Sequence, residues 1–438
     1  MKYFLTLIQL WVGFLSICAS YPKANIWIIP SVESPQVYRN YAQTSKVHLE
    51  MARGEVEHIQ LVFPSKVNEE YRFTFDRYLK GIQISARELK KMNGYYDALV
   101  PFKNQLKCTD TLTAVWITVQ CPSRVPVGKY HQTIKIEGSK HFTIQLDYNV
   151  HHTTIPLKSS IPITVGVENR CMTECLNDKE ADKERQRWVD FVLSYRMTPV
   201  FGTQITPERW QYEHSFSPWA WNDKRSIRLL NDRRYSCYML PFFTLSENEL
   251  ASLLCNIQKK GKLKESLFYI WDEPAYMEDY EQIKRKVNII RKYASDARIL
   301  TTFFCGPRNG PRKGDLYAVF DYLKHHIHVA TISLAPCKGN EEEVQHIRYK
   351  VPEGIDWWSY VCWQPGGNEP NFLLQMKGIQ QRAIMWRTWK NGSQGFLYWN
   401  CNIYHKRNPF TYITDMPHGD GIPVSYTHLR AHETCADL

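Results

Sequence analysis

Two adjacent carboxylic acids, Asp272 and Glu273, follow the apolar segment SLFYIW at residues 266–271, and Pro274 comes directly after them. Burying one unpaired carboxylate is costly, and two like charges side by side cost more. An ion pair with an arginine or a helix cap would explain a single acid at this point. For a pair of acids that ends an apolar strand, we favour a catalytic role.

The spacing of the two acids restricts the chemistry they can do. Enzymes that cleave glycosidic bonds usually hold two carboxyl groups roughly 5 to 10 Å apart on opposite sides of the bond, whereas neighbouring Cα atoms are only about 3.8 Å apart. Adjacent acids can instead serve neighbouring atoms of one sugar. Glu273 would protonate the leaving oxygen, and Asp272 would hold a 2-acetamido group whose carbonyl attacks the anomeric carbon. The charge of Asp272 would raise the pKa of Glu273 and keep it protonated.

The chain from about residue 160 alternates between apolar strands and helices. The predicted strands are 161–167, 198–203, 237–243, 266–271, 297–304, 328–334, 357–363 and 395–400. Ser246 and Glu249 form a predicted capping box at the start of one helix. This rhythm predicts a (β/α)8 barrel over residues 160–423, with a doubly wound open sheet as the alternative. Catalytic groups of such barrels lie at the carboxyl ends of strands, and the two acids end the fourth strand.

The ends of the seventh and eighth strands are rich in groups that suit a sugar. The C–H face of a pyranose packs on indole rings, and its hydroxyls need donors and acceptors. The predicted sugar-binding residues are Trp363, Trp399, Tyr360, Asn400 and Tyr404. Glu168 and Asn169, at the end of the first strand, are further candidates for hydroxyl recognition.

Residues 22–155 have a different pattern, in which β-branched and aromatic residues alternate with polar ones. The predicted strands include 46–52, 114–121, 129–138 and 141–151, with glycine-containing turns between them. No long amphipathic helix interrupts this region, so it is predicted to be an antiparallel β-sandwich. The fold class is therefore α/β, a barrel preceded by an antiparallel β-sandwich domain.

Several phrases resemble glycoside hydrolase family 123. They are YIWDEP (269–274), WWSYVCWQP (357–365), QRAIMWRTWKNGSQGFLYWNCNIY (381–404) and GDG (419–421), preceded by ARGEVEHIQLVF (52–63) and DALVPFK (97–103). The resemblance runs over nearly all of residues 25–422. It implies an exo-acting β-N-acetylgalactosaminidase that retains configuration through an oxazoline-type intermediate. By this resemblance Glu273 is the general acid/base, and Asp272 orients and stabilises the acetamido nitrogen.

The resemblance also implies a substrate and leaves alternatives open. The expected partner is the glycan of a glycolipid or a glycoprotein, and no cofactor or metal is expected. One alternative is a glycosidase for another 2-acetamido sugar, such as a β-N-acetylglucosaminidase. The other is a non-catalytic carbohydrate-binding protein. The formal charge of +11 is spread over many scattered lysines and arginines, which indicates a solvated surface and no nucleic-acid partner.

The two ends of the chain carry segments that are not expected to belong to the fold. Residues 1–20 are mainly apolar after one lysine and predict a signal peptide, hence a secreted or periplasmic protein. Acylation of Cys18 as a lipoprotein is an alternative, and no second segment is apolar enough to cross a membrane. Residues 424–438 resemble the translation of a sequencing adapter and are expected to be non-native. The barrel would then be incomplete, without its eighth helix.

Overall fold

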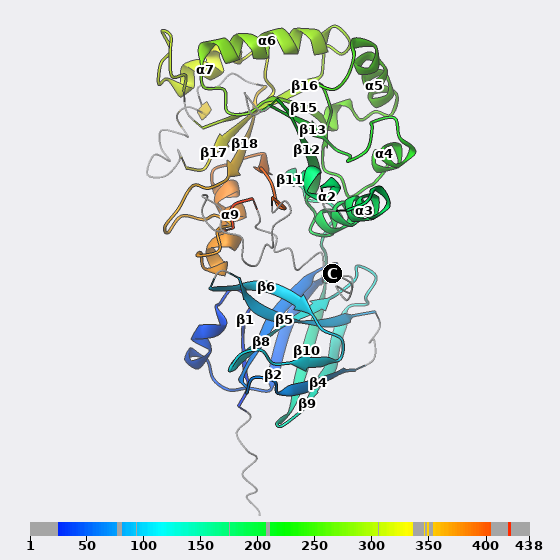
Figure 1. Cartoon of the computed structure of the whole chain (residues 1–438), viewed down its shortest axis with the longest axis vertical. Coiled ribbons are helices and arrows are strands. Elements are labelled where there is room, and N and C mark those ends of the chain that lie inside the picture. Colours follow the sequence, from blue (N-terminus) through cyan, green and yellow to red (C-terminus); the bar gives the residue numbers. More distant parts are fainter. Residues whose placement is uncertain are drawn as a thin grey trace, which may run out of the picture. The chain divides into compact units, whose positions relative to one another are not determined.

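The computed structural model describes residues 25–76, 81–92, 94–174, 176–206, 211–304, 306–335, 346, 348–349, 354–403 and 419–421. The predicted signal peptide and the predicted adapter-derived tail lie outside these residues. The chain divides into two compact units, one formed by residues up to 89 with 102–154 and the other by 90–101 with residues from 155 onward. Figure 1 shows the elements of both. Within the described residues, no helix combines the length and the hydropathy that a membrane span requires.

The strands of the N-terminal half form two five-stranded sheets. The first has the order β1 (Trp27–Pro30), β3 (Val56–Pro64), β8 (Leu112–Gln120), β5 (Gln83–Met92) and β6 (Tyr95–Pro101). The second has the order β2 (Lys46–Arg53), β10 (His141–Thr154), β9 (Gly128–Glu137), β4 (Glu70–Phe75) and β7 (Gln105–Lys107). One short 3-10 helix, η1 (Pro35–Asn40), follows β1.

Alternating side chains of these strands build the core of this half. Along β9, Ile134 and Ile136 are fully buried while Lys135 between them is exposed, as the period of two in a strand requires. The predicted sandwich is confirmed in its strands and its antiparallel pairing, with one exception. β2 pairs with β10 in parallel, Leu49 lying opposite Tyr148, so this sheet is mixed. The alternation of residues within a strand does not reveal the direction of its neighbour.

The second unit contains a nine-stranded sheet that curves into an almost closed barrel (Figure 1). Eight of its strands are β11 (Ile163–Glu168), β12 (Thr198–Thr206), β14 (Tyr238–Met239), β15 (Ser266–Trp271), β16 (Arg298–Phe303), β17 (Val329–Ser333), β18 (Asp356–Val361) and β19 (Gly395–Tyr398). Neighbouring strands of this set pair in parallel, including the last with the first, β19 with β11, except that β12 and β14 do not pair. The predicted (β/α)8 barrel is thus confirmed.

The barrel departs from the prediction at its third strand. Residues 237–243 were expected to form a full strand, but only Tyr238 and Met239 do so, and they pair only with β15. A ninth strand, β13 (Gln211–Ser215), runs antiparallel to β12 on the side where β12 and β14 would otherwise meet. The backbone N–H of Phe216 donates to the carbonyl of Met239 at 2.7 Å, which connects this hairpin to β14. The antiparallel pairing of β13 with β12 therefore replaces the parallel pairing expected between β12 and β14.

Helices surround the strands. They are α2 (Arg170–Thr173), α3 (Asp178–Ser194), α4 (Lys224–Leu229), α5 (Glu247–Lys259), α6 (Met277–Arg291), α7 (Leu316–Leu323) and α9 (Gly378–Lys390), with the 3-10 turn η3 (Leu263–Glu265). The predicted capping box of Ser246 and Glu249 is confirmed at the start of α5. Outward side chains of the strands pack on these helices, while Leu267, Leu300 and Val329 belong to a separate cluster inside the barrel. Most strands therefore lie between two apolar layers, as in other barrels of this class.

Candidate active site

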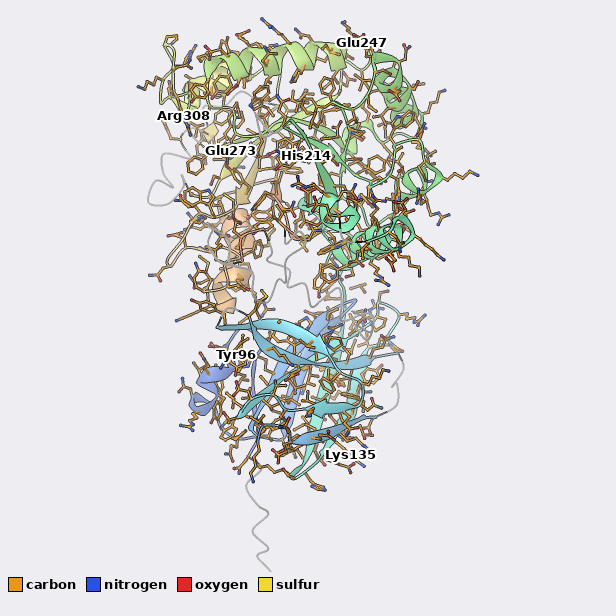
Figure 2. The ribbon with its side chains drawn as sticks, in the orientation of Figure 1. Tyr96, Lys135, His214, Glu247, Glu273 and Arg308 are labelled. Carbon is orange, nitrogen blue, oxygen red and sulfur yellow. The ribbon has the colours of Figure 1, made fainter. Side chains whose placement is uncertain are left out.

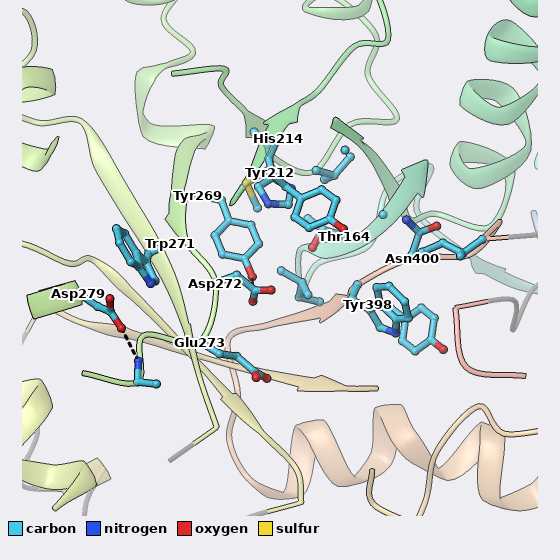
Figure 3. Close-up of a pocket in the computed structure, with 18 of the residues that line it drawn as sticks. Thr164, Tyr212, His214, Tyr269, Trp271, Asp272, Glu273, Asp279, Tyr398 and Asn400 are labelled. Atoms are coloured by element: carbon cyan, nitrogen blue, oxygen red, sulfur yellow. Dashed lines mark hydrogen bonds between the residues drawn. The ribbon is translucent and has the colours of Figure 1, made fainter. Parts of the chain in front are cut away.

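A cavity of about 720 Å³ opens at the carboxyl ends of the barrel strands. Asp272 and Glu273 line it, and both side chains are exposed to its interior. Figure 3 shows these acids on one side of the cavity and Tyr398 and Asn400 on the other. The strand-end position predicted for the acid pair is therefore where the structure places it.

The backbone turns sharply at the acid pair. The register of β15 against β16 shifts between Tyr269 and Trp271, and Glu273 then has a φ of 43°, in the left-handed region that few residues other than glycine adopt. Adjacent side chains in an extended strand would point to opposite faces. The turn breaks that alternation, so Asp272 and Glu273 both face the cavity. The backbone N–H of Glu273 donates to Thr302 Oγ1 at 2.9 Å, which fixes the turn to β16.

Asp272 is held by two hydroxyl groups. Tyr269 donates to its Oδ1 atom at 2.7 Å, and Thr302 donates to the same atom at 2.8 Å. Tyr269 and Thr302 come from the inner faces of β15 and β16, and both are buried. Within the described residues no donor reaches Oδ2 of Asp272, so one oxygen is fixed by the protein and the other is open to the cavity.

Glu273 has a different environment. Its Oε1 atom accepts a hydrogen bond from the hydroxyl of Tyr360 on β18, a side chain that is only 3% exposed. The surrounding protein displaces much of the bulk water, which raises the pKa of Glu273, and the charge of Asp272 raises it further. The hydrogen bond from Tyr360 and the charge of Arg308 oppose this rise, but the pKa stays above its ordinary value. Two neighbouring acids thus have distinct surroundings.

The loop after the acid pair is fixed by the start of α6. Asp279 Oδ2 accepts hydrogen bonds from the backbone N–H groups of Ala275 and Tyr276, each at 2.9 Å. The hydroxyl of Tyr280, which is fully buried, donates to the carbonyl of Pro274 at 3.1 Å. These contacts limit how far the acid pair can move, because the chain is held on both sides of it.

The end of β19 forms the opposite wall of the cavity. Trp399 lines it, and its indole N–H donates to Asp420 Oδ1 at 2.8 Å. Asn400 also lines it, and its Oδ1 atom accepts from the backbone N–H of Asn402 at 3.1 Å. Gly166 on β11 makes this wall possible, because a Cβ atom there would lie only 1.8 Å from the carbonyl oxygen of Trp399.

The predicted sugar-binding residues fall into three groups. Trp399 and Asn400 line the cavity, and Tyr360 reaches it through its hydrogen bond to Glu273. Trp363 is not among the residues that line the cavity, and 46% of it is exposed. Tyr404 lies outside the described residues.

The two further candidates at the end of β11 lie away from this cavity. Glu168 and Asn169 line a separate hollow of about 370 Å³ near the ends of β11 and β12. Glu168 is buried, and its backbone exchanges two hydrogen bonds with the side chain of Asn402, at 2.7 and 3.2 Å. Asn169 accepts a hydrogen bond from Arg185 at 2.8 Å. These contacts join β11 to the segment after β19 and to α3.

Among the residues of the site that were not predicted from the sequence, two pairs matter most. Tyr269 and Thr302 occupy interior positions of strands and resemble ordinary core residues until the fold brings them to Asp272. Tyr212 and His214 come from β13, whose sequence QYEHS has no apolar run. The alternation of an aromatic, an acid and a histidine was the one available signal for that strand.

The described residues contain no cluster of three or more histidine, cysteine or acidic side chains that could hold a metal ion. Most cysteines of this part of the chain are buried thiols without a disulfide, namely Cys108, Cys121, Cys237, Cys362 and Cys401. Burial raises the pKa of the Cys237 and Cys362 thiols to about 12, so they stay protonated. Among the described residues that line the cavity with the acid pair, the other titratable side chains are carboxylic acids, tyrosines and His214.

Comparison with known proteins agrees with this description. The family model "Glycoside hydrolase 123, catalytic domain" matches residues 183–424, more than half of the chain. A solved family 123 glycoside hydrolase from Clostridium perfringens superposes with a TM-score of 0.62 at 13% identity, over 91% of this chain and 82% of that one. No curated protein matches.

Two other solved structures match over much of the chain but superpose too loosely to bear on the fold. A Bacteroides ovatus GH5 xyloglucanase has a TM-score of 0.30 at 10% identity, over 86% of this chain and 96% of that one. A glycosyl hydrolase family 2 member from Bacteroides cellulosilyticus has a TM-score of 0.32 at 11% identity, over 82% and 47%.

The match to the family model identifies the chain as a glycosidase, an enzyme that cleaves glycosidic bonds in glycans. The chain belongs to glycoside hydrolase family 123.

Proposed function

We propose that the protein is an exo-acting, retaining hydrolase that releases terminal β-linked N-acetylgalactosamine, with the 2-acetamido group of the substrate as the nucleophile. The observation that carries this proposal is the acid pair, Asp272 and Glu273, which opens into one cavity but has two different sets of partners. Two carboxyls so close together cannot flank a sugar from opposite sides. They can act on two neighbouring atoms of the same sugar.

Asp272 has the geometry to hold an amide. Tyr269 and Thr302 saturate its Oδ1 atom, and Oδ2 remains available for the N–H of an acetamido group. A hydrogen bond from that N–H to a carboxylate increases the electron density on the acetamido carbonyl oxygen, which becomes a better nucleophile. The two hydroxyl donors fix the orientation of the carboxyl group, so that Oδ2 faces the cavity.

Glu273 has the properties of the proton donor. Its raised pKa keeps a proton on the carboxyl group closer to neutral pH than an ordinary glutamate would. Tyr360 holds one of its oxygens, which leaves the other to approach the leaving oxygen of the substrate. The neighbouring charge of Asp272 contributes to the raised pKa, so each acid depends on the other.

The reaction would proceed in two steps. First, the acetamido carbonyl oxygen forms a bond to the anomeric carbon, the glycosidic bond breaks, and Glu273 transfers its proton to the leaving oxygen. The product is an oxazolinium held by Asp272. Second, Glu273, now a carboxylate, takes a proton from water as the water oxygen attacks the anomeric carbon and reopens the ring. Two inversions at the same carbon give net retention.

The choice of sugar rests on the family and on the size of the cavity. A volume of about 720 Å³ lies within the usual range for a small-molecule site. The family 123 enzyme from Clostridium perfringens is described in terms of glycolipid glycan hydrolysis. We extend this to a glycolipid or glycoprotein glycan as the substrate of the present chain. The signal peptide predicted for residues 1–20 supports a secreted or periplasmic location.

A comparison of substrates tests the proposal. Aryl β-N-acetylgalactosaminide should be cleaved with retention, and faster than the β-N-acetylglucosaminide. Successive fluorination of the acetyl group should lower kcat/KM stepwise, because electron withdrawal weakens the carbonyl nucleophile. Equal rates across the fluorinated series, or brisk cleavage of a sugar with a plain 2-hydroxyl, would refute participation of the substrate.

The assignment of the proton donor needs a variant and a matched control. Glu273→Gln should lose activity on substrates with poor leaving groups, since glutamine cannot donate a proton to them. Glu247→Gln makes the same chemical change on an exposed residue of α5 and should leave the rate unchanged. Full activity of Glu273→Gln would reject the assignment. Binding of the sugar without any turnover by the unmodified protein would favour a carbohydrate-binding protein instead.

A further inference from the structure

Strand β13 contributes two side chains to the lining of the cavity. Neither side chain has a role in the reaction proposed above. Tyr212 and His214 are two residues apart and therefore lie on the same face of the strand, and both line the cavity. Glu213 between them points the other way and is buried, accepting backbone hydrogen bonds from Phe242 at 2.8 Å and Thr244 at 2.7 Å. The buried acid fixes the strand to the segment after β14, so the positions of its two neighbours are well defined.

The imidazole ring of His214 is positioned by an aromatic neighbour. Its imidazole stacks on the ring of Tyr269, with centroids 4.2 Å apart and an angle of 16° between the planes. Among the described residues, no group forms a hydrogen bond with either ring nitrogen, and the side chain is partly exposed to the cavity. Figure 2 shows His214 and Glu273 in the interior of the barrel unit, and Figure 3 shows His214 beside Tyr212 above Tyr269. The ring thus presents polar atoms toward the space that a substrate would occupy.

The protonation state of His214 decides what it can recognise. Burial lowers its pKa to about 3, which favours the neutral form of the imidazole near neutral pH. A neutral imidazole has one donor and one acceptor, which is the same pair of functions that a sugar hydroxyl has. It would add no charge beside Asp272 and Glu273.

We infer that His214 is a specificity-determining residue, which forms a hydrogen bond with one ring hydroxyl of the bound sugar. The inference rests on the proposed function, because it assumes that the sugar lies against Tyr269 with its acetamido group at Asp272. Tyr269 connects the two contacts, since its hydroxyl holds Asp272 and its ring face carries His214. Tyr269 therefore sets the distance between Asp272, which would bind the amide, and His214, which would bind a hydroxyl.

The chemistry explains why such a contact would select among sugars. Burying a polar group without a hydrogen-bond partner costs more free energy than the hydrogen bond contributes when it is made. A sugar that lacks the hydroxyl, or holds it in the other orientation, would therefore bind more weakly. His214 does not touch the bond that breaks. Its loss should therefore act on kcat/KM for particular sugars rather than on proton transfer.

The test combines variants with deoxy sugars. His214→Phe keeps an aromatic ring for the stack on Tyr269 and removes both nitrogens, and we expect kcat/KM for the parent aryl glycoside to fall about 10- to 100-fold. With an analogue that lacks the contacted hydroxyl, the unmodified enzyme and the variant should be equally slow. His214→Gln, which can donate and accept, should recover part of the rate on the parent sugar. Tyr293→Phe removes one hydroxyl hydrogen bond, to Glu247 at 2.6 Å outside the cavity, and serves as the control.

Two outcomes would overturn the inference. One is an unchanged kcat/KM for His214→Phe on the parent sugar. The other is a loss of equal size with every deoxy analogue, which would show that the ring only supports the cavity wall. Thermal unfolding of each variant identifies a folding defect, in which case His214→Gln carries the comparison.

Calorimetric binding of the monosaccharide to the unmodified protein and to His214→Phe requires no turnover. Failure of catalysis in the unmodified protein would thus count against the proposed function, and unchanged binding in His214→Phe would count against the role of His214.

Discussion

The replacement Tyr360→Phe tests how the pKa of Glu273 is set. The hydroxyl of Tyr360 donates to the carboxyl of Glu273, and this hydrogen bond favours the ionised form. Phenylalanine preserves the ring inside the barrel but has no donor. The opposing effects, desolvation and the charge of Asp272, remain in place, so the pKa of Glu273 should rise further above its ordinary value.

The size of the shift follows from the strength of one hydrogen bond. A hydrogen bond to a charged group contributes about 1.5 to 3 kcal/mol, and one pKa unit corresponds to about 1.36 kcal/mol. Glu273 is open to the cavity, so solvent screening reduces the effect, and the hydroxyl can also bond to the protonated acid. We therefore expect a rise of about 0.5 to 1 unit in the pKa of Glu273.

The assay is the pH dependence of kcat/KM, which reports groups of the free enzyme. Glu273 must be protonated to donate, so activity falls as the pH rises through its pKa. In Tyr360→Phe the alkaline limb should move to higher pH by the same 0.5 to 1 unit. The substrate needs a poor leaving group, because an activated one departs without a proton. A limb that stays in place, or moves to lower pH, in a folded variant would refute the reasoning, and Tyr293→Phe should show no shift.

Three further predictions address the frame of the site and the start of the chain. Thr302→Val keeps the shape of the side chain but removes one donor to Asp272 and the acceptor for the backbone N–H of Glu273, so steady-state assays should show kcat about 10- to 100-fold lower and thermal unfolding a lower Tm; an unaltered kcat would contradict this. Asn402→Ala removes two hydrogen bonds to the backbone of Glu168, so urea denaturation should give a free energy of unfolding about 1 to 3 kcal/mol lower, and an unchanged midpoint would argue against it. Expression of the whole chain in a secreting host should yield a mature protein that begins near Tyr21, and mass spectrometry that finds the first residues intact would reject the signal peptide.

The barrel and the position of the acid pair were accessible from sequence because they depend on local patterns. An apolar strand that ends in Asp272 and Glu273 needs no tertiary information to be noticed, and helical periodicity together with a capping box identified α5. The partners of the acids could not be found in this way. Tyr269 and Thr302 lie in different strands, and only the pairing of β15 with β16 brings their hydroxyls to one carboxylate oxygen.

The aromatic residues after the strands show a second limit. Trp358, Tyr360 and Cys362 alternate along β18 and its extension, and all three belong to the cluster inside the barrel. Trp363 has the opposite parity and is about half exposed, at 46%. Sequence alone does not reveal where the alternation stops, and the strand β18 ends at Val361. Composition can therefore predict an aromatic wall without identifying which of its members face the cavity.

Strand β13 is a part of the barrel unit whose sequence can vary without changing the parallel pairing of the other strands. Because it stands outside the ring of parallel pairings, residues could be inserted or exchanged in it without altering the order of the eight other strands. The acid pair follows β15 and is held by Thr302 of β16 and Tyr360 of β18, whereas Tyr212 and His214 of β13 make no hydrogen bond to either acid within the described residues. Exchange of this one short strand is therefore a route by which protein engineering can reshape the cavity while the acid pair stays in place.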